Sequence, residues 1–448
     1  MEATPTSDEL LTTILTPGPL HDPYPAYRAL RELAPVHHAN AAGIWCLTRY
    51  EDTKVILHDR RFGRGRDRRG GGLASLTGGA DVQSRERLRV MADTMLFADP
   101  PEHGRLRGLV SRAFTPKRIE ALRPALERLI EPLLDEIADN GTVDLLDRLA
   151  FPYPVAVIGE LLGVPAEDRP GFRTLVRDST AFIEAAPTED QLDQAEMALA
   201  TMTTYFEELV AQRARSPRDD LISAMVAVSA GGDELTRDEI VSTAILLFGA
   251  GFETTTNLIG NGVFTLLRNP EQLARLRADP TLLTGAVEEV LRYESPVQLN
   301  ARTALRDADV CGQPVSEGTV VVTFLGAANR DPERFEDPDS FDITRPDVQP
   351  LSFGWGIHRC LGAQLARVEG EVAFGRLLER FDRIELAGSP SWRPSLTLRG
   401  LADLPVRVHT REREVRGLRP GDRRTRRQRR LDRERASRLP RPPDRRRG

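Results

Sequence analysis

Cysteine is scarce in this 448-residue chain, which has only Cys46, Cys311 and Cys360. Three cysteines are too few for a disulfide framework, and this suits a reducing cytosol. Long apolar runs are missing too, since none approaches the ~18 residues that cross a bilayer. The first nine residues, MEATPTSDE, are acidic and polar and lack the basic and apolar regions of a signal peptide. We therefore expect a cytoplasmic protein without a membrane partner.

The charge of the chain is unevenly distributed. Residues 409–448 carry 17 arginines and six acidic residues, whereas the rest of the chain holds 45 basic and 61 acidic residues. This basic tail has almost no apolar periodicity, so we expect it to be disordered. Arginine clusters bind phosphate, which leaves a nucleic-acid partner as a disfavoured alternative. The remaining 1–408 have the ordinary apolar and charged content of a globular domain.

Helical signals dominate residues 1–408. A Thr236–Glu239 capping box predicts the start of a long helix, and strand signals are short and scattered. Apolar spacing predicts helices over 124–140, 172–185 and 190–213, and strands over 43–48 and within 310–323, with a turn at Glu317–Gly318. The glycine- and arginine-rich residues 64–79 predict a loop.

Residues 351–362, LSFGWGIHRCLG, surround Cys360 with glycines at fixed offsets. Glycines let a chain turn tightly and approach a flat ligand closely. Backbone amides in such a turn can lower the pKa of the sulfur, and a thiolate held this way suits an axial position on haem iron. Alternatives are a small buried hydrophobe or a nucleophile paired with a distant histidine. Zinc is disfavoured because no second cysteine or suitably spaced histidine is present.

A second motif, AGFETT at 250–255, follows an apolar run that begins at Val241. An acid and a hydroxyl inside an apolar helix are costly unless they serve a purpose. Ala250 and Gly251 are small enough to let a diatomic ligand lie against the backbone. Thr254 lies one turn from Gly251 and could bond a preceding carbonyl and hold a water. The alternative is a helix kink with a solvated Glu253.

Together these motifs resemble cytochrome P-450, and the cysteine loop followed by Ala363–Arg367 is similar to that of soluble bacterial members. The resemblance spans roughly residues 20–408. It implies a single, mainly α-helical domain with small β-sheets, and haem b between the long helix and the Cys360 loop. Phe353, Gly354 and Gly362 would line the haem. Glu253 and Thr254 correspond to an acid–alcohol pair that supplies protons for splitting O2, with Ala250 and Gly251 beside the oxygen. Phe252 stands where related bacterial proteins often have histidine.

The third motif is Glu289 and Arg292, spaced i, i+3 and able to pair on one helix face. Taken alone, such a pair is a surface ion pair of small worth. The resemblance gives it a structural role, with Arg345 as the expected third member. It also assigns the haem propionates to four groups, which suit contacts to carboxylates. These groups are His103, Arg107, Arg302 and His358.

The substrate pocket is expected to have a roof from residues 64–94 and 182–197. Its floor would be largely apolar, which suits a bulky hydrophobic molecule. The floor residues would be Leu247, Phe248, Val297, Leu299, Asn300 and Leu401. The resemblance favours tailoring of a macrolide, polyketide or related natural product in antibiotic biosynthesis. Steroid or xenobiotic hydroxylation, or haem binding without turnover, are the alternatives.

The resemblance also implies the source of electrons. They would come from NAD(P)H through a ferredoxin reductase and a ferredoxin, in a protein that works as a monomer. An acidic body that meets an acidic ferredoxin needs a locally basic docking face near Cys360, and Arg359 and Arg367 are the candidates. The alternative for both is a solvated surface role.

Overall fold

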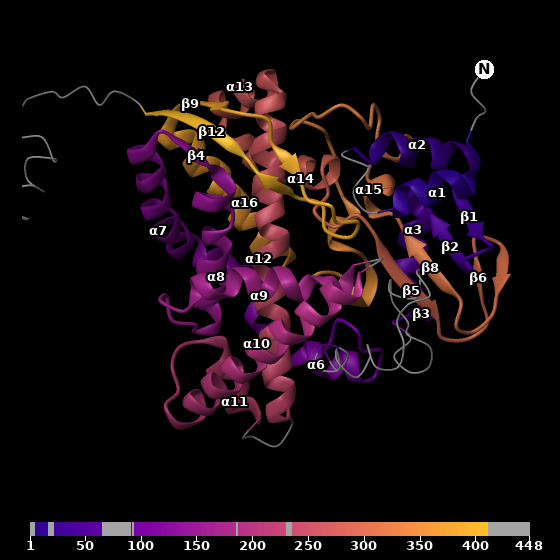
Figure 1. The fold of residues 1–448 in the computed structure, drawn as a ribbon, viewed down its shortest axis with the longest axis horizontal. Helices are drawn as coiled ribbons and strands as arrows, with labels where there is room; N and C mark the ends of the chain where they lie inside the picture. Colours follow the sequence, from indigo (N-terminus) through magenta and orange to yellow (C-terminus); the bar gives the residue numbers. More distant parts are fainter. Residues whose placement is uncertain are drawn as a thin grey trace, which may run out of the picture. The chain divides into compact units, whose positions relative to one another are not determined.

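The computed structural model describes residues 5–16, 22–64, 91, 94–184, 187–229 and 235–410. All of these belong to one unit, Met1–Thr410. Of the disordered tail predicted over 409–448, His409 and Thr410 belong to strand β12, and the rest lies outside the described residues. Nearly all of the predicted loop over 64–79 also lies outside them. Within the described part, helices predominate over short strands (Figure 1).

The helices are longest in the middle of the chain. Their bounds are α1 Ser7–Leu15, α2 Tyr24–Leu33, α3 Tyr50–His58, α6 Glu102–Ser111, α7 Pro116–Asn140, α8 Pro152–Leu162, α9 Phe172–Ser179, α10 Glu189–Arg215, α11 Leu221–Ser229, α12 Arg237–Arg268, α13 Pro270–Ala278, α14 Leu283–Tyr293, α15 Leu325–Ala328 and α16 Ala363–Arg380. None of the helices in these described segments is both long and apolar enough to cross a membrane.

Helix α12 is the central element and packs against α8, α10 and α16. The predicted capping box begins it: the Glu239 amide donates to Thr236 Oγ1 at 3.2 Å, and the Thr236 amide donates to Glu239 Oε2 at 2.8 Å. Most of its residues are buried on every side, as expected for a helix that is apolar all round. Positions of α12 that are not buried therefore indicate where the helix can face a ligand.

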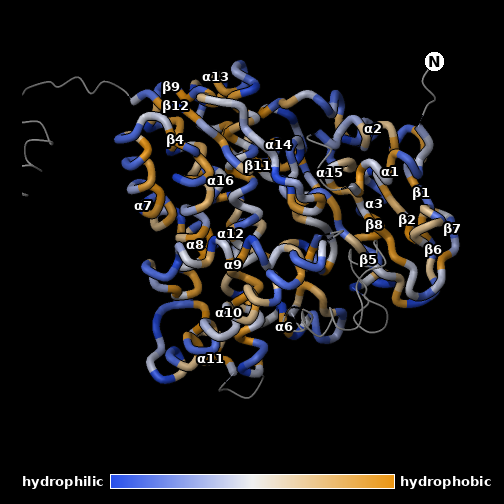
Figure 2. The backbone as a smooth tube through the Cα atoms, viewed as in Figure 1, coloured by the Kyte–Doolittle hydropathy of each residue, from blue (hydrophilic) through white to orange (hydrophobic). Residues whose placement is uncertain are grey.

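The strands form small sheets. Their bounds are β1 Val36–Ala39, β2 Ile44–Leu47, β3 Phe62–Gly63, β4 Thr142–Asp144, β5 Asn300–Ala304, β6 Ala308–Val310, β7 Gln313–Val315, β8 Val320–Thr323, β9 Phe381–Leu386, β10 Ser391–Trp392, β11 Leu401–Asp403 and β12 Pro405–Thr410. The five-stranded sheet has the order β1-β2-β8-β5-β3, and only its β2–β8 pair is parallel. Figure 2 shows hydrophobic residues recurring along β2 and β8, which supply the core on both faces of the sheet.

Most predicted elements are present with shifted bounds. The helix predicted over 124–140 begins earlier, at Pro116, because proline is well suited to a first helical turn. It ends as predicted, before Gly141 at φ 74°. The helix predicted over 172–185 ends at Ser179 and continues as a 3-10 turn, Thr180–Ile183, before Glu184 becomes extended. The predicted strand region 310–323 contains an additional turn at Cys311–Gly312, which joins β6 to β7.

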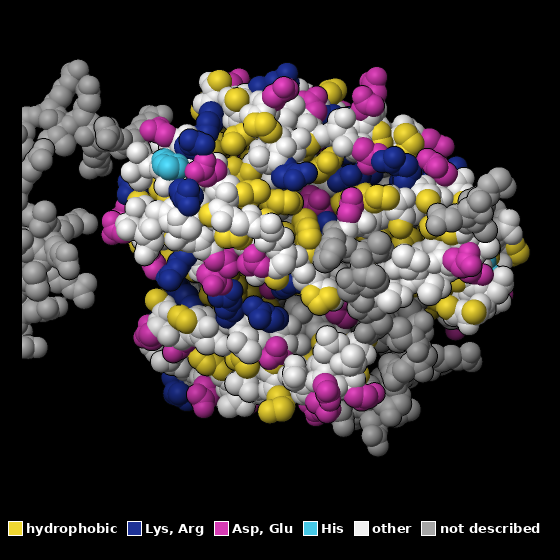
Figure 3. Space-filling view, turned by 45° about the horizontal axis from the view of Figure 1, so that its top comes forward, with side chains coloured by type: hydrophobic (Ala, Val, Ile, Leu, Met, Phe, Trp, Pro, Cys, Tyr) yellow, Lys and Arg dark blue, Asp and Glu magenta, His cyan; other side chains and the backbone are white. Residues whose placement is uncertain are grey.

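Acidic and basic side chains are intermixed on the surface. Figure 3 shows them side by side on the face that it draws. Arg123, for example, donates to both Glu120 and Glu371, and so ties α7 to α16. Exposed pairs of this kind contribute little to stability, so the fold depends on its apolar clusters and on the buried pairs described below.

Candidate active site

The Cys360 loop is held in a fixed turn. Gly354 and Gly356 have φ of 64° and 71°, a region that favours glycine. A Cβ on Gly356 would lie 2.3 Å from the carbonyl oxygen of Leu57, so the loop rests directly on the backbone of α3. The Cys360 amide donates to the Phe353 carbonyl at 2.8 Å and closes the turn. The loop therefore presents an exposed thiol from a rigid frame.

The surroundings of the Cys360 sulfur act on its pKa in opposite directions. Burial by the surrounding protein raises the pKa of the thiol, even though part of the residue is open to solvent. A hydrogen bond from the Gly362 backbone and the charges of Arg107, Arg367 and Arg359 lower it. The predicted amide contact is therefore present, but burial has the larger effect. A cation placed against the sulfur would favour the thiolate.

Two arginines brace the loop. Arg107 of α6 donates to the Arg359 carbonyl at 2.6 Å. The Arg367 guanidinium lies 4.6 Å from the centre of the Phe353 ring and pairs with Glu288 of α14. The Arg367 guanidinium is thus already paired with groups of the protein, whereas Arg359 is exposed to solvent.

The four predicted propionate groups come together beside this loop. The His103 and His358 rings lie 4.3 Å apart. Burial, followed by the charges of Arg64, Arg302, His103 and Arg107, lowers the pKa of His358 to about 2. Burial, Arg107 and other nearby cations also lower the pKa of His103, against the opposing charge of Asp99. The groups are therefore close enough for the positive charges of the arginines to disfavour protonation of both histidines.

Arg64 belongs to this cluster, and sequence reasoning missed it by assigning it to a loop. Its backbone amide donates to Asp99 at 2.8 Å, and burial lowers the pKa of its guanidinium to about 10. Strand β3 pairs Gly63 with Thr303 of β5, which brings Arg64 beside Arg302. A short-range motif could not reveal this contact, because it depends on pairing between distant strands.

The cluster has the chemistry of an anion site. Arg64 Nε, His103 Nε2 and His358 Nε2 are buried and have no hydrogen-bond partner. Buried polar groups are rarely left unpaired, and Asp99 supplies one opposing charge beside Arg64 and Arg302. Haem carries two propionates that would pair with these nitrogens and arginines, and the nearby Cys360 would supply a ligand to its iron. The residues present therefore fit haem.

The AGFETT motif occupies one open stretch of α12. Ala250 is exposed and Thr254 half-buried, although their neighbours on the helix are mostly buried. Thr254 Oγ1 donates to the Ala250 carbonyl at 3.0 Å, the bond that the sequence suggested. Gly251 differs from the prediction, since a Cβ there would lie 3.0 Å from Ile158 of α8. The open face is therefore formed by Ala250 and Thr254, with Gly251 turned toward α8.

Glu253 is buried and ion-paired, so the alternative of a solvated side chain is wrong. Its carboxylate pairs with Arg393, which also donates to Asn257 Oδ1 at 2.8 Å. These residues border a cavity of about 30 Å³ that Leu401 also lines, large enough for water. Thr256 Oγ1, Asn257 Nδ2 and Arg393 Nε are buried without protein partners, which water would supply.

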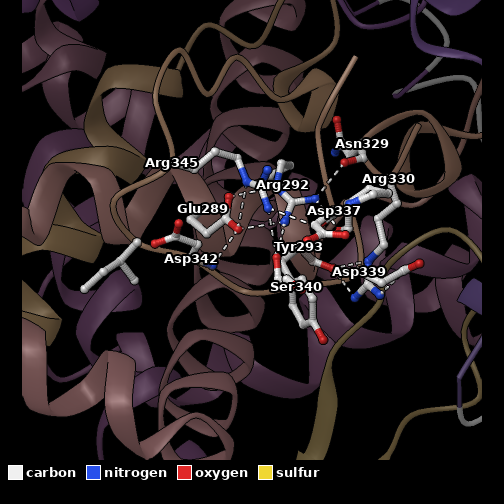
Figure 4. A network of polar contacts seen from close by, with 12 residues as sticks. Glu289, Arg292, Tyr293, Asn329, Arg330, Asp337, Asp339, Ser340, Asp342 and Arg345 are labelled. Atoms are coloured by element: carbon white, nitrogen blue, oxygen red, sulfur yellow. Dashed lines mark hydrogen bonds and ion pairs between the residues drawn. The ribbon is translucent and has the colours of Figure 1, made fainter. Parts of the chain in front are cut away.

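The Glu289–Arg292 pair is fully buried rather than a surface ion pair (Figure 4). Arg292 Nε and Nη2 each donate to the Glu289 carboxylate at 2.7 Å, and Arg345 Nε lies 3.4 Å from it. Arg292 also donates to the carbonyls of Asn329, Pro338 and Ser340. Asn329 Oδ1 in turn accepts from the Leu351 amide at 2.7 Å, so the network reaches the start of the cysteine loop.

The six predicted floor residues have different surroundings, and their role in binding substrate stays a prediction. Phe248 is buried among Phe172, Phe206 and Phe252. Leu299 lies in the cluster that contains Phe324. Leu401 faces the Glu253 cavity, as noted, and Leu247 is also buried in the main core.

The other two predicted floor residues, Asn300 and Val297, have partners outside the main core. Asn300 accepts hydrogen bonds from Arg64 and Arg302, and so belongs with the cation cluster. Val297 pairs with Leu398, a residue that sequence reasoning did not name. A β-bridge to a segment so distant in the chain leaves no local sequence signal.

Comparisons with known proteins agree with this geometry. The Cytochrome P450 family model matches residues 186–397. Cytochrome P450 107B1 of Saccharopolyspora erythraea is 44% identical over 396 residues, covering 86% of this chain and 95% of that protein. The 6-deoxyerythronolide B hydroxylase of the same organism is 41% identical over 398 residues, covering 86% of this chain and 96% of that protein. The crystal structure of P450BioI with an acyl carrier protein ligated to hexadec-9Z-enoic acid has a TM-score of 0.80 at 39% identity, covering 87% of this chain and 99% of that one.

The fold and these likenesses define a haem-dependent monooxygenase of the bacterial type. The chain belongs to the cytochrome P450 family. Its family, fold class and enzyme class are therefore as the sequence predicted, whereas the roles of its individual site residues stay predictions.

Proposed function

We propose that this cytochrome P450 inserts one oxygen atom from O2 into a bulky apolar substrate, by hydroxylation or epoxidation, in the tailoring of a macrolide, polyketide or related natural product. The observation that carries the haem site is the buried cation cluster, with its unpaired nitrogens, beside the exposed Cys360 thiol. The macrolide assignment is supported by the relative named as a 6-deoxyerythronolide B hydroxylase.

In this proposal Cys360 binds the haem iron as a thiolate. Haem, when bound, would supply the oxygen-activating chemistry, which a thiolate ligand favours by donating electron density. His103, Arg107, Arg302, His358 and Arg64 hold the propionates. Phe353 and the glycines of the loop keep water from the sulfur and let the loop approach the ring.

The protein also moves protons. Thr254 is open on the same face as Ala250 and can accept a hydrogen bond from water while it donates to the Ala250 carbonyl. Glu253 passes a proton from the cavity beside Arg393 toward Thr254. Water in the cavity then supplies Glu253 with a new proton. Arg393 orients the carboxylate, and Phe252, packed between Phe151 and Phe248, keeps this region apolar.

Electrons come from NAD(P)H through a ferredoxin reductase and a ferredoxin. The ferredoxin would bind over the Cys360 loop, where Arg359 is exposed and Arg107 is half-buried. Arg367 contributes less to this face because it pairs with Glu288.

The carbon monoxide difference spectrum of the dithionite-reduced protein tests the haem site. A Soret band at the position typical of thiolate-ligated haem supports it, and loss of that band in Cys360→His identifies the ligand. A band typical of histidine ligation in the unaltered protein would overturn the site, as would absence of haem.

Spin-state shifts then test the substrate class. Macrolactones and linear polyketides are titrated beside steroids of similar size. A shift with macrolactones alone supports the proposed class, whereas a shift with steroids alone replaces it with the steroid alternative.

A further inference from the structure

Glu184 joins two segments that are far apart in the chain. It follows the 3-10 turn Thr180–Ile183, and its carboxylate accepts three hydrogen bonds from a turn near the C-terminal strands. Ser395 Oγ donates to Oε1, and the amides of Leu396 and Thr397 donate to Oε2 at 3.1 and 3.3 Å. Thr397 Oγ1 adds a bond to the Ile183 carbonyl at 2.9 Å.

The other side of this turn binds the predicted pocket floor. Leu398 forms an antiparallel bridge with Val297, and the Gln298 amide donates to the Thr397 carbonyl at 2.9 Å. Leu396 packs against the apolar cluster that contains Leu299. The turn is therefore held between a predicted floor segment and Glu184, which lies in the predicted roof region 182–197.

The chemistry of the contact makes it sensitive to small changes. Glu184 binds two amides and a hydroxyl here, and such bonds to a carboxylate are stronger than neutral ones. A glutamine would turn an NH2 group toward one set of these donors, and so could satisfy only part of the turn. Ser395 also uses its hydroxyl oxygen to accept from the Leu398 amide at 3.0 Å, so the turn's own shape is linked to the contact.

We infer that Glu184 is a positioning residue for substrate size: it fixes the turn Ser395–Leu398 against the roof region and thereby places Leu398, beside Val297, along one wall of the pocket. The inference rests on the proposed function, because it requires that this pocket receives the substrate. The affinity of bulky ligands should depend on the position of this wall. The affinity of a ligand small enough to reach the haem without touching the wall should not.

The test uses the full-length haem-loaded protein with Glu184→Gln, Glu184→Ala and Ser395→Ala. Glu208→Gln is the matched control, because Glu208 is an exposed residue of α10 that lies outside the predicted roof region 182–197. The first measurement is hydrogen exchange at the Leu396 and Thr397 amides. We expect exchange about tenfold faster or more in both Glu184 variants, because local opening no longer breaks these bonds, and unchanged exchange in the control.

The second measurement is azole binding, with imidazole, 4-phenylimidazole and clotrimazole as probes of increasing size. We expect imidazole affinity to stay within about twofold and clotrimazole affinity to change by about fivefold or more in the Glu184 variants. Ser395→Ala, which removes one donor, should give a smaller change in the same direction.

The outcomes separate the contact from its role. Unchanged amide exchange would overturn the inference, because the contact would be absent in solution. Faster exchange with equal effects on all three azoles, or with none, would also overturn it, because Glu184 would then act on the fold alone. Failure of the proposed function is seen separately, as a missing thiolate-type spectrum in the unaltered protein.

Discussion

Glu253 on α12 and Arg393, in the segment between β10 and β11, form a largely buried ion pair that links the central helix to the C-terminal strands. Their side chains are 7% and 22% exposed. Because Arg393 also binds Asn257, the helix is fixed at two adjacent turns.

Removing Arg393 should therefore cost stability. In Arg393→Ala the Glu253 carboxylate stays enclosed without its partner, and we expect a loss of about 2 kcal/mol, below the range for fully buried pairs because this one is partly open. Urea unfolding of the haem-loaded protein measures it. Arg407→Ala is the control, since that arginine is 56% exposed and 3.8 Å from Glu385, and it should lose less than about 0.5 kcal/mol. Equal losses would contradict the prediction.

Replacing the acid itself should affect turnover more than stability. Glu253→Gln keeps the volume but cannot exchange a proton, so we expect substrate oxidation to slow about 100-fold. The measurement is the rate of product formation and the product formed per NAD(P)H consumed, both with a surrogate ferredoxin system. Glu379→Gln, on the exposed face of α16, is the control and should match the unaltered protein. Product yield that stays normal in Glu253→Gln would remove this residue from proton delivery.

Gly356 should tolerate no side chain. In Gly356→Ala the new Cβ would lie 2.3 Å from the Leu57 carbonyl oxygen, so backbone must shift and the cysteine loop should lose its haem. Gly43→Ala is the matched control, because Gly43 has a similar φ of 64° with nothing within 4 Å, and it should cost only about 1–2 kcal/mol. Haem content per protein distinguishes the two. Equal haem content in both variants would show that the contact with α3 is unimportant.

The buried arginine network should require arginine itself. Arg292→Lys keeps the charge but loses the planar fork that binds Glu289 and three carbonyls. We expect a loss of about 3–5 kcal/mol, measured by thermal and urea unfolding. Arg383→Lys, at an arginine whose side chain is 71% exposed, should be close to neutral. A mild effect in Arg292→Lys would mean that the network is not a main support of the cysteine loop.

Glu369 of α16 should make stability fall as the pH rises. Burial raises its pKa well above the usual range, so the folded state holds a proton that the unfolded state releases. The stability from this group is fully present below the unfolded pKa and is lost as pH rises toward the folded pKa, by up to about 1.4 kcal/mol per pH unit. Glu369→Gln should therefore gain stability relative to the unaltered protein as the pH rises above the usual pKa of glutamate, about 4.3. The free energy of unfolding of both proteins is measured against pH. If the two plots run parallel, Glu369 does not have a raised pKa in the folded state.

The sequence predicted the parts of the site that local patterns encode. The loop around Cys360, the AGFETT stretch and the capping box at Thr236 each lie within a few residues, and their geometry follows from glycine freedom and helix spacing. Arg64 and Arg393 were beyond such reasoning. Each reaches the site through strand pairing or a contact between distant segments, and a lone arginine in the sequence carries no sign of its partner.

The predicted substrate floor stays a prediction for a related reason. Apolar residues at core positions and at pocket positions look alike in a sequence, so Phe248, Leu299 and Leu401 could not be told from core residues. Only their packing against Phe172, Phe324 and the Glu253 cavity separates them.

The contact between Gly356 and Leu57 has a consequence for how the chain assembles. The loop that presents the thiol is completed by backbone from α3, roughly 300 residues earlier, so it cannot take its final shape until the two ends of this span have met. Long-range closures of this kind are slow and come late in folding. During synthesis, nearly the whole domain is made after α3 before the loop around Gly356, which packs on α3, has been synthesised. We therefore expect the proposed haem site to be completed late in the biogenesis of the chain, after most of the domain has folded.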